Sequence, residues 1–249
     1  MPLQNHPSDL QVSATYSAAD LAYIYPAQDR KTVPFGIGAA SPAYTFEYVV
    51  FKRIFDISVV LLFSPFILLF IAALCLVVAL SSPGPIFFSH RRIRRGGAFF
   101  SMWKFRTMCV NSAEVLERHL TLHPEDRKEW DLNHKLRNDP RVNSIGRLLR
   151  RFSLDELPQI WNVLTGRMSL VGPRPIVAAE VEKYAENFAY YTAVTPGITG
   201  LWQASGRSTL TYDERVALDR YYVENWSLWL DLKVFFRTIR CVVNSDGAY

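Results

Sequence analysis

Cysteine is scarce in this sequence, with three residues in 249, at positions 75, 109 and 241. They are far apart and show no CxxC spacing, so the sequence predicts neither a disulfide framework nor a zinc site. The first residues, MPLQNHPSDLQ, also lack the basic start and immediate apolar run of a secretory signal. We therefore expect a reducing compartment and an N-terminus that stays in the cytoplasm.

Acidic residues are in the minority, with 23 Asp and Glu against 28 Lys and Arg, so the formal net charge is +5. This balance suits anionic partners such as phosphates, nucleic acid or an acidic membrane surface. The chain has no recognised nucleic-acid-binding module, and its arginines lie close to a long apolar segment, so we expect no nucleic-acid partner. Its length is sufficient for one large domain or two small ones with a buried core.

Charges are few and no hydrophobic period is sustained in residues 1–46. This composition predicts a loose N-terminal tail. Its Tyr and Ile content is also compatible with a short docked segment, and that alternative stays open.

A long apolar run follows, with no charge between residues 57 and 80. These 24 residues would form about 36 Å of helix, enough to cross a hydrocarbon core of about 30 Å. However, cations at 52 and 53 precede the run and four arginines between 91 and 95 follow it, so both flanks carry the signature of a cytoplasmic face. Pro65, preceded by Ser64, favours a kink. These features only slightly favour a re-entrant helix over an ordinary kinked transmembrane helix.

Aromatic and β-branched residues alternate with cations in IFFSHRRIRRGGAFFSMWKFRTM, which follows the Pro/Gly break SSPGP. Gly96 and Gly97 suit a turn between two short strands, which predicts a small hairpin that faces anions. The alternative is a basic juxtamembrane stretch held to acidic lipid.

Two further segments favour surface helices. Residues 111–137 are charge-dense and broken at Pro124; His119 and His123 have metal-ligand spacing there, but no third ligand is clearly placed. Near the C-terminus, the stretch RVALDRYYVENWSLWLDLKVFFRTIRCVV predicts an amphipathic basic helix with aromatic neighbours. That helix suits a membrane interface or, equally, a protein core with solvated cations.

The stretch SLDELPQ, residues 153–159, places two adjacent acids at an expected helix start. Ser153 as N-cap and Glu156 at N3 predict a capping box, with Phe152 and Leu157 as its hydrophobic staple. Pro158, expected inside the helix, would free the carbonyl group of Leu154. Local rules alone thus favour a structural role for the acids.

The surroundings favour chemistry instead. Arginines at 147, 150 and 151 precede the acids, and Arg174 follows between two prolines in VGPRP, which would hold one guanidinium as a phosphate-binding fork. A carboxylate near several cations is expected to stay ionised, as a nucleophile or metal ligand must. One acid could attack phosphorus while the other holds Mg²⁺.

The chain resembles the bacterial sugar transferase family, the monotopic polyprenyl-phosphate phosphoglycosyl transferases, from about residue 46 to its C-terminus. The resemblance rests on motifs that follow one another in order: KRIFD, the Ser64-Pro65 pair, PGPIFFSHRR, KFRTM, RNDPR, SLDELPQIWNVL, MSLVGPRP, PGITGLWQASGR and the ending DGAY.

This resemblance implies that Asp155 is a covalent nucleophile, that Glu156 helps to bind Mg²⁺ with it, and that Arg174 binds phosphate. Asp155 would attack the β-phosphorus of a UDP-hexose, release UMP and pass the sugar phosphate to undecaprenyl phosphate. Charge and motif position add five expected substrate-binding residues: Lys104, Arg106, Arg150, Gln203 and Arg207. In the family's usual GDMS motif, Arg167 here replaces the acid, and His90 and Arg94 also depart from the pattern.

The expected fold is mainly α with a small β-hairpin, in a monotopic membrane protein with interfacial amphipathic helices. Residues 1–46 would be the tail, 47–82 the re-entrant membrane helix kinked at Ser64-Pro65, and 83–249 a cytoplasmic catalytic domain at the bacterial inner membrane. The resemblance is closest to transferases of galactose or glucose phosphate that start exopolysaccharide or O-antigen repeats. A non-catalytic adaptor that binds acidic lipid or an assembly partner is the alternative, and a homodimer remains open.

Overall fold

The computed structural model describes residues 41–133, 136–205 and 210–243, and this part of the chain is mainly helical. The predicted fold class is confirmed to that extent. The strands are β1 (Phe87–Ile93), β2 (Phe99–Phe105), β3 (Ser169–Val171) and β4 (Gly197–Thr199). The α-helices are α3 (Phe46–Ser81), α4 (Ser112–Leu122), α5 (Pro124–Asn133), α6 (Ser144–Arg151), α7 (Gln159–Leu164), α8 (Val181–Tyr184), α9 (Phe188–Ala193), α10 (Leu201–Ser205), α11 (Tyr212–Glu224) and α12 (Leu228–Val243). Short 3-10 turns are η2 (Pro42–Tyr44), η3 (Arg95–Gly97), η4 (Leu154–Glu156), η5 (Ala178–Glu180) and η6 (Ala185–Asn187).

The hairpin is formed as expected. β1 and β2 pair antiparallel, with Phe87 opposite Phe105 and Ile93 opposite Phe99. Gly96 and Gly97 both have a φ of 77°, a conformation that glycine adopts without a steric penalty and other residues rarely do. The two glycines thus close the turn that the alternating pattern predicted.

A second sheet, which the sequence did not predict, pairs β3 with β4 in parallel. The two strands are separated by 25 residues of the chain, and Ser169 lies opposite Gly197. The backbones of these two segments lie very close together, because a Cβ atom built on Gly197 would lie 2.2 Å from the backbone nitrogen of Gly172. Only glycine fits at this position, and the pair sits in the centre of the body between α3, α7 and α12.

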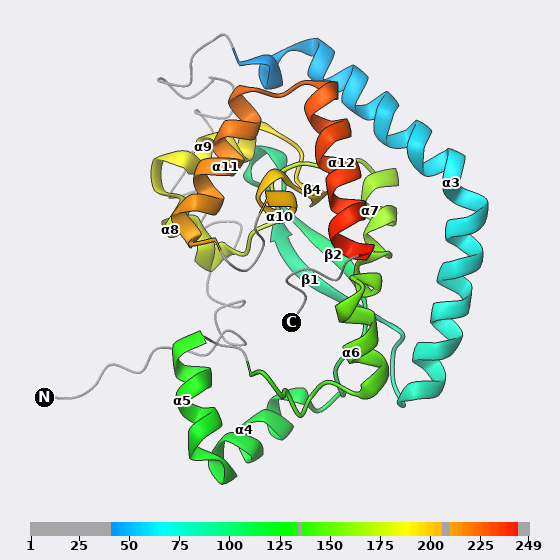
Figure 1. The fold of residues 1–249 in the computed structure, drawn as a ribbon, viewed down its shortest axis with the longest axis vertical. Coiled ribbons are helices and arrows are strands. Elements are labelled where there is room, and N and C mark those ends of the chain that lie inside the picture. The colour runs from blue at the N-terminus through cyan, green and yellow to red at the C-terminus, as the bar shows by residue number, and fades with distance from the viewer. Residues whose placement is uncertain (1–40, 134–135, 206–209, 244–249) are drawn as a thin grey trace, which may run out of the picture.

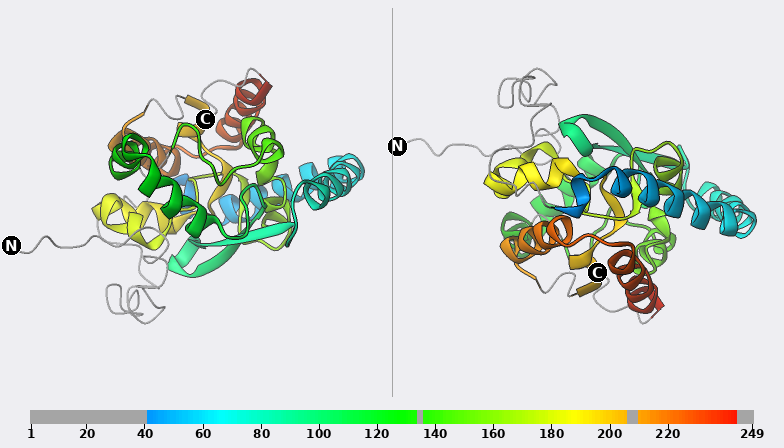
Figure 2. Two further views of the ribbon diagram at one scale, coloured as in Figure 1. Left: turned by 90° about the horizontal axis from the view of Figure 1, so that it is seen from below. Right: turned by 90° about the horizontal axis from the view of Figure 1, so that it is seen from above.

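Helix α3 follows an arc around one side of the body (Figure 1). Its 36 residues correspond to about 54 Å, and among the described residues it is the helix long and apolar enough to cross a membrane. It continues through Pro65 without a break, where Ser64 Oγ donates to the carbonyl group of Leu61 at 2.8 Å. Seen from above, its N-terminal part lies over the body and the remainder extends beyond it (Figure 2).

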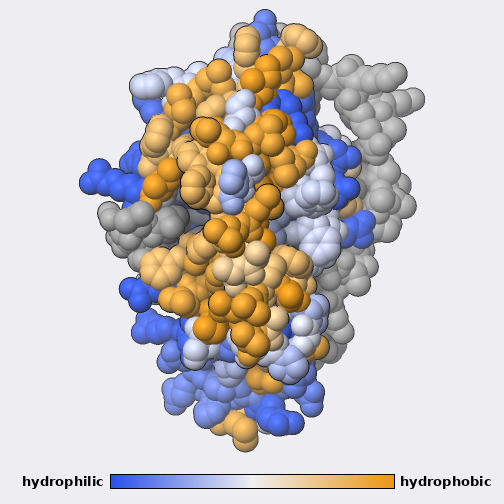
Figure 3. Space-filling model, turned by 90° about the vertical axis from the view of Figure 1, so that its right-hand side faces the viewer, coloured by the Kyte–Doolittle hydropathy of each residue, from blue (hydrophilic) through white to orange (hydrophobic). Residues whose placement is uncertain are grey.

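Both ends of α3 pack on the same body. Tyr48 and Val60 belong to the main core, whereas Leu74 and Val78 pack with Phe105 and its neighbours. The middle of the helix instead exposes a broad apolar surface (Figure 3) that includes Leu62, Phe66, Leu68 and Leu69.

Buried polar contacts fix the N-terminal half of α3. Lys52 Nζ lies 2.7 Å from Asp231 of α12, and both side chains are almost fully buried. Asp231 also accepts hydrogen bonds from the Tyr222 hydroxyl and the Trp226 indole, at 2.7 and 3.1 Å. One turn further along α3, Asp56 accepts from the hydroxyl group of Ser169 at 2.9 Å. Lys52 and Asp56, the first and last residues of KRIFD, thus both make buried contacts with other parts of the body.

The end of the predicted tail is docked. Ser41 Oγ donates to the carbonyl group of Val223 at 2.6 Å, and Ala43 is fully buried in the main core. Thr45 then caps α3 by accepting from the backbone nitrogen of Tyr48 at 3.2 Å. Residues 1–40, for which the loose tail was predicted, lie outside the described residues.

The two expected surface elements are helical. Helices α4 and α5 are separated at Pro124, as the sequence indicated, and they pack on a small satellite core of Leu116, Leu120 and Leu136. In α12, Val234 is buried while Trp229 and Phe236 are exposed. The C-terminal helix thus packs on the core with one face and presents aromatic side chains on another.

Candidate active site

The acidic pair lies on η4, a single 3-10 turn between α6 and α7. The predicted capping box is wrong: Ser153 has a left-handed backbone, with φ 54° and ψ 23°, and its side chain makes no cap hydrogen bond. The physical reason is that Glu156 is bound by cations and does not turn back to the helix start. Pro158 is likewise the residue before α7 and not inside a helix, and the carbonyl group of Leu154 accepts from Leu157.

Helix α7, which follows the acids, is held from two sides. Asn162, fully buried, donates to the carbonyl group of Ser101 at 2.8 Å and accepts from the backbone nitrogen of Trp103 at 3.1 Å. The guanidinium of Arg53 on α3 donates to the carbonyl groups of Val163 and Leu164 at the other end of α7. The acidic turn is therefore positioned by the β1–β2 hairpin and by helix α3 together.

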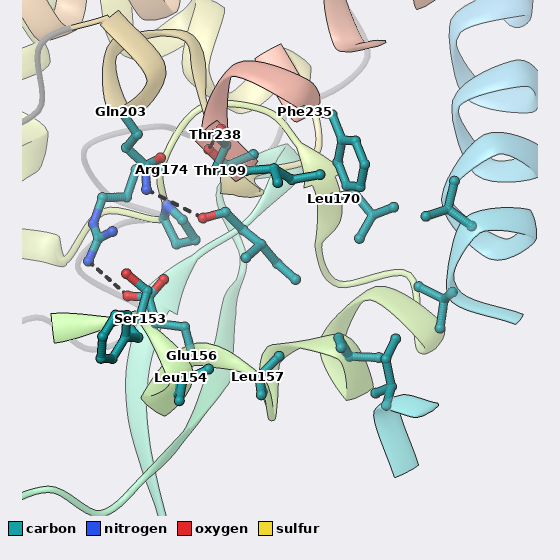
Figure 4. A pocket seen from close by; sticks show the side chains of 18 of the residues that line it. Ser153, Leu154, Glu156, Leu157, Leu170, Arg174, Thr199, Gln203, Phe235 and Thr238 are labelled. Carbon is teal, nitrogen blue, oxygen red and sulfur yellow. Dashed lines mark hydrogen bonds and ion pairs between the residues drawn. The ribbon is translucent and has the colours of Figure 1, made fainter. Parts of the chain in front are cut away.

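Two cations contact the acidic pair. Lys104 of β2 has its Nζ 2.7 Å from Glu156 Oε1 and 3.6 Å from Asp155 Oδ2. Arg174 contacts the same Glu156 oxygen at 3.4 Å (Figure 4). The backbone of Arg174 is set by the prolines on either side of it, as the sequence suggested. The pair and the two cations form one compact charged centre.

Burial and neighbouring charges shift the pKa values of Asp155 and Glu156 in opposite directions. Burial raises the pKa of Asp155, and Lys104 only partly opposes this effect. Burial would also raise the pKa of Glu156, but the nearby charges of Arg174 and Lys104 outweigh it and lower that pKa to about 2. Glu156 is thus a firmly ionised partner of the cations, whereas Asp155 is the more basic carboxylate and has the less neutralised oxygen atoms.

A cavity of about 1580 Å³ adjoins this centre, larger than the roughly 300–1,000 Å³ typical of small-molecule sites. Figure 4 shows Arg174 and Gln203 on one side and Leu170 and Phe235 on the other. Charged side chains line one end, namely Arg92, Arg150, Glu156, Arg174, Glu180 and Arg215. Apolar side chains of α3 and α12 line the other, among them Phe55, Phe63, Phe66, Phe235, Phe236 and Ile239.

The structure brings together most of the residues predicted to bind substrate. Arg150 and Gln203 line the cavity with Arg174, and Arg150 Nε donates to the hydroxyl group of Thr107 at 2.9 Å. Lys104 reaches the acids from β2. Asp155 does not itself line the cavity; its carboxylate lies beside Lys104 with 11% of the side chain exposed.

Arg106 lies elsewhere. Its guanidinium donates to the carbonyl groups of Ser82 and Pro83, at 2.6 and 2.9 Å, and so fastens the turn that follows α3. Gly84, with a φ of 118°, leaves room for it, since a Cβ atom there would lie 2.2 Å from Arg106 Nη1. Arg207, also predicted to bind substrate, lies outside the described residues.

Sequence reasoning missed several residues at the charged end of the cavity: Arg92, Glu180, Tyr184, Trp202, Tyr212 and Arg215. Trp202 and Gln203 are adjacent in the motif GLWQASGR, so that motif carried a usable signal. The others come from β1, η5, α8 and α11, and no local pattern in the sequence connects these elements.

A divalent cation would have few protein ligands here. Among the described residues no group of three or more His, Cys, Asp or Glu side chains is placed to hold a metal ion. Asp155 and Glu156 fit Mg²⁺ only as a two-carboxylate set that substrate phosphate oxygens complete, which is a common arrangement for this ion. His119 Nε2 lies 2.6 Å from Asp126 Oδ2, and the ring centroids of His119 and His123 lie 4.3 Å apart with the rings tilted by 36°. In the described part of the chain no further ligand completes a metal site at this pair.

Comparison with known proteins gives a consistent result. The family described as "Bacterial sugar transferase" matches residues 47–245. A "UDP-galactose-lipid carrier transferase" of Erwinia amylovora is 49% identical over 80% of this chain and 41% of its own length. An "Undecaprenyl-phosphate galactose phosphotransferase" of Salmonella typhimurium is 51% identical over 67% of this chain and 35% of its own length. The "Exopolysaccharide production protein ExoY" of Rhizobium meliloti is 47% identical over 80% of this chain and 88% of its own length. The chain thus spans about two fifths of the first two relatives and most of the third.

Proposed function

Because this chain belongs to the bacterial sugar transferase family, we propose that it transfers hexose 1-phosphate, galactose or glucose, from a UDP-sugar to undecaprenyl phosphate. The names of two relatives support this choice, since one refers to UDP-galactose and a lipid carrier and the other to undecaprenyl phosphate and galactose. The name of a third refers to exopolysaccharide production, so the product would start repeat units of an exopolysaccharide or O-antigen.

The observation that carries the proposal is the position of the acidic pair beside a cavity with a charged end and an apolar end. The reaction requires a water-soluble nucleotide sugar and a lipid to meet at one phosphorus atom. The cationic end supplies Arg150 and Arg174 for phosphate groups, and the apolar end suits a hydrocarbon chain. The cavity volume leaves room for parts of both substrates.

We propose that Asp155 is the nucleophile. One of its carboxylate oxygens forms a bond to the β-phosphorus of the UDP-hexose, and the bond from that phosphorus to the bridging oxygen breaks, so that UMP leaves. In the second step a phosphate oxygen of undecaprenyl phosphate attacks the same phosphorus and releases Asp155. Its raised pKa supports this role, because a more basic carboxylate is a better nucleophile while it remains ionised at neutral pH.

Lys104, Arg174 and Glu156 would stabilise the charges of the phosphate groups. Lys104 and Arg174 would contact the diphosphate and offset the negative charge that shifts to the leaving UMP. Glu156, held by both cations, would keep them oriented toward the phosphates. Asp155 and Glu156 would also hold Mg²⁺, which when bound would neutralise phosphate charge.

The position of α3 supports a monotopic arrangement at the cytoplasmic face of the bacterial inner membrane. Both ends of the helix pack on one body, while its middle exposes apolar side chains. A helix that crossed the bilayer would carry its two ends to opposite sides, whereas a re-entrant helix brings them back to the same side. The exposed Trp229 and Phe236 of α12 would lie at the interface beside it.

The test is release of UMP from UDP-hexose by membranes that contain the protein, Mg²⁺ and undecaprenyl phosphate. We expect Asp155→Asn to abolish release, and Asp131→Asn, at an exposed position of α5, to leave it unchanged. Equal release from the wild type and Asp155→Asn would refute the nucleophile. No release from any form with any UDP-sugar would favour the alternative of a non-catalytic adaptor that binds acidic lipid or an assembly partner.

A further inference from the structure

The charged end of the cavity continues beyond Arg174 into a group of aromatic and polar side chains, which we call the polar arm. It consists of Arg92, Glu180, Tyr184, Trp202, Tyr212 and Arg215, all of which line the cavity. These residues come from β1, η5, α8, α10 and α11. The acidic pair forms its ion pairs with Lys104 and Arg174 and with none of these six residues, so the arm forms a separate part of the site.

The polar arm is held in place by contacts behind it. Glu180 Oε2 accepts from the backbone nitrogen of Val177 at 2.9 Å and lies 3.5 Å from Arg92 Nη1. Tyr184 donates to the buried Asp219 at 2.7 Å. These bonds fix the walls of the arm before any ligand binds, which lowers the entropic cost of recognition.

The arm also contains polar atoms that the described residues leave unsatisfied. The Nε atoms of Arg92 and Arg215 are buried and have no hydrogen-bond partner in the described part of the chain. The hydroxyl group of Tyr212 is also buried, and it bonds to the carboxylate of Glu180, which leaves its second hydrogen-bonding position for a ligand. Buried donors and acceptors in folded proteins are nearly always paired. Unpaired donors beside a cavity wall are groups that a polar ligand or an ordered water would satisfy.

An aromatic platform lies among these atoms. The guanidinium carbon of Arg215 lies 4.9 Å from the ring centroid of Trp202, and Arg215 Nη2 donates to the carbonyl group of Leu210 at 2.9 Å. The guanidinium is therefore fixed over the indole, and its buried Nε has no partner among the described residues. An aromatic face next to fixed donors and acceptors suits a ring that has both C–H and hydroxyl groups, such as a hexose.

The order of the proposed reaction favours the hexose over the uridine for this arm. Each displacement at phosphorus requires the entering and leaving groups roughly in line. The phosphate of the lipid must therefore enter where UMP has left, whereas the hexose stays beside Asp155 through both steps. The polar arm is preformed and distinct from the apolar end of the cavity, so it suits the hexose, which stays bound through both steps.

We propose that Trp202, Tyr212 and Arg215 form the subsite that recognises the hexose of the donor, with Tyr212 and Arg215 bonded to its hydroxyl groups. This inference rests on the proposed function for the identity of the ligand. Galactose and glucose differ only in the orientation of one hydroxyl group, and a site that hydrogen-bonds a hydroxyl discriminates strongly against a ligand that misplaces it. The polar arm would therefore decide which UDP-hexose is used.

The experiment measures equilibrium binding in the full chain with Asp155→Asn, so that no turnover is needed. UDP-galactose, UDP-glucose and UMP are titrated against this protein alone, with Tyr212→Phe added, and with Tyr221→Phe added as the control. Tyr221 is half-exposed on the same helix and outside the cavity. We expect Tyr212→Phe to change the ratio of the two UDP-hexose affinities by about tenfold, to leave UMP affinity unchanged, and the control to change neither.

Equal weakening of both UDP-hexoses and of UMP by Tyr212→Phe would overturn the proposal and assign the arm to uridine. Unchanged binding of all three would overturn it in favour of a structural role. Binding of the UDP-hexoses with the expected dependence on Tyr212, but no release of UMP by the wild type, would refute the proposed function and leave the subsite in place.

Discussion

The buried ion pair between Lys52 and Asp231 links the membrane-type helix α3 to the C-terminal helix α12. The charged atoms lie 2.7 Å apart, and the side chains are 3% and 0% exposed. Two further donors, Tyr222 and Trp226, bind the same carboxylate. Removing either charge would leave the other buried without its counter-charge.

The expected cost is large because of this burial. Breaking a buried pair on one side costs about 3–5 kcal/mol of unfolding free energy, since an uncompensated charge remains. For a chain of this length, each kcal/mol shifts the midpoint of thermal unfolding by about 2–4 °C. We therefore expect Lys52→Met and Asp231→Leu each to lower the midpoint by about 10 °C.

The assay is thermal and denaturant unfolding of the detergent-solubilised protein, with both single variants and the double variant. Replacing both charges with apolar residues removes the uncompensated charge, so the double variant should be much less destabilised than the sum of the two single variants. Glu114→Gln serves as the control, because it breaks an exposed pair with Arg118 and should cost less than about 1 kcal/mol. If the single variants cost no more than this control, or if their effects simply add, the reasoning from burial is wrong.

Three further changes test other parts of the structure. Burial raises the pKa of Asp219 to about 7 from its ordinary 3.8, so the folded state binds this proton more tightly and stability should fall as pH rises from about 4 to 7. Asp219→Asn should remove that loss and stabilise the protein at about pH 8 by up to roughly 4 kcal/mol; matching pH profiles for both forms in denaturant unfolding would contradict this. Arg174→Lys keeps the charge but loses the guanidinium fork, so KM for the UDP-sugar should rise about tenfold with little change in thermal stability, and an unchanged KM would count against phosphate binding. Gly197→Ala places a Cβ atom 2.2 Å from the backbone of Gly172, so it should destabilise the fold by more than about 2 kcal/mol, and a normal unfolding midpoint would show that the strands can separate.

The residue pattern of the sequence predicted those elements whose formation depends on interactions between residues close together in the chain. The alternation of aromatic and cationic residues with Gly96 and Gly97 predicted the hairpin, because strand periodicity and turn chemistry are both short-range. The uncharged run predicted a long apolar helix for the same reason. Pro124 separated two helices as expected.

Tertiary contacts overrode local pattern at the acidic turn. Ser153 and Glu156 have the spacing of a capping box, but Lys104 arrives from a strand about fifty residues earlier and binds the glutamate. The backbone of Ser153 is left-handed, and its side chain makes no cap hydrogen bond. Sequence spacing alone cannot show that the fold places Lys104 beside Glu156, where it competes with the capping interaction.

The composition of the cavity was predictable only in part. Arg150, Arg174 and Gln203 fell within motifs, and the structure places all three at the cavity. Arg106 had the same charge and a similar motif position, yet it fastens the turn after α3. The residues of the polar arm converge from elements spread over more than a hundred positions, a convergence that only the assembled fold makes visible.

The central claim is covalent attack by Asp155 on the β-phosphorus. The most direct measurement is the intact mass of the purified protein after incubation with UDP-hexose and Mg²⁺ in the absence of a lipid acceptor. We expect a mass increase equal to one hexose phosphate, located on the peptide that contains Asp155, which disappears when undecaprenyl phosphate is added. Release of UMP that requires the lipid acceptor, with no adduct at any time, would contradict the claim and indicate direct transfer between the two substrates.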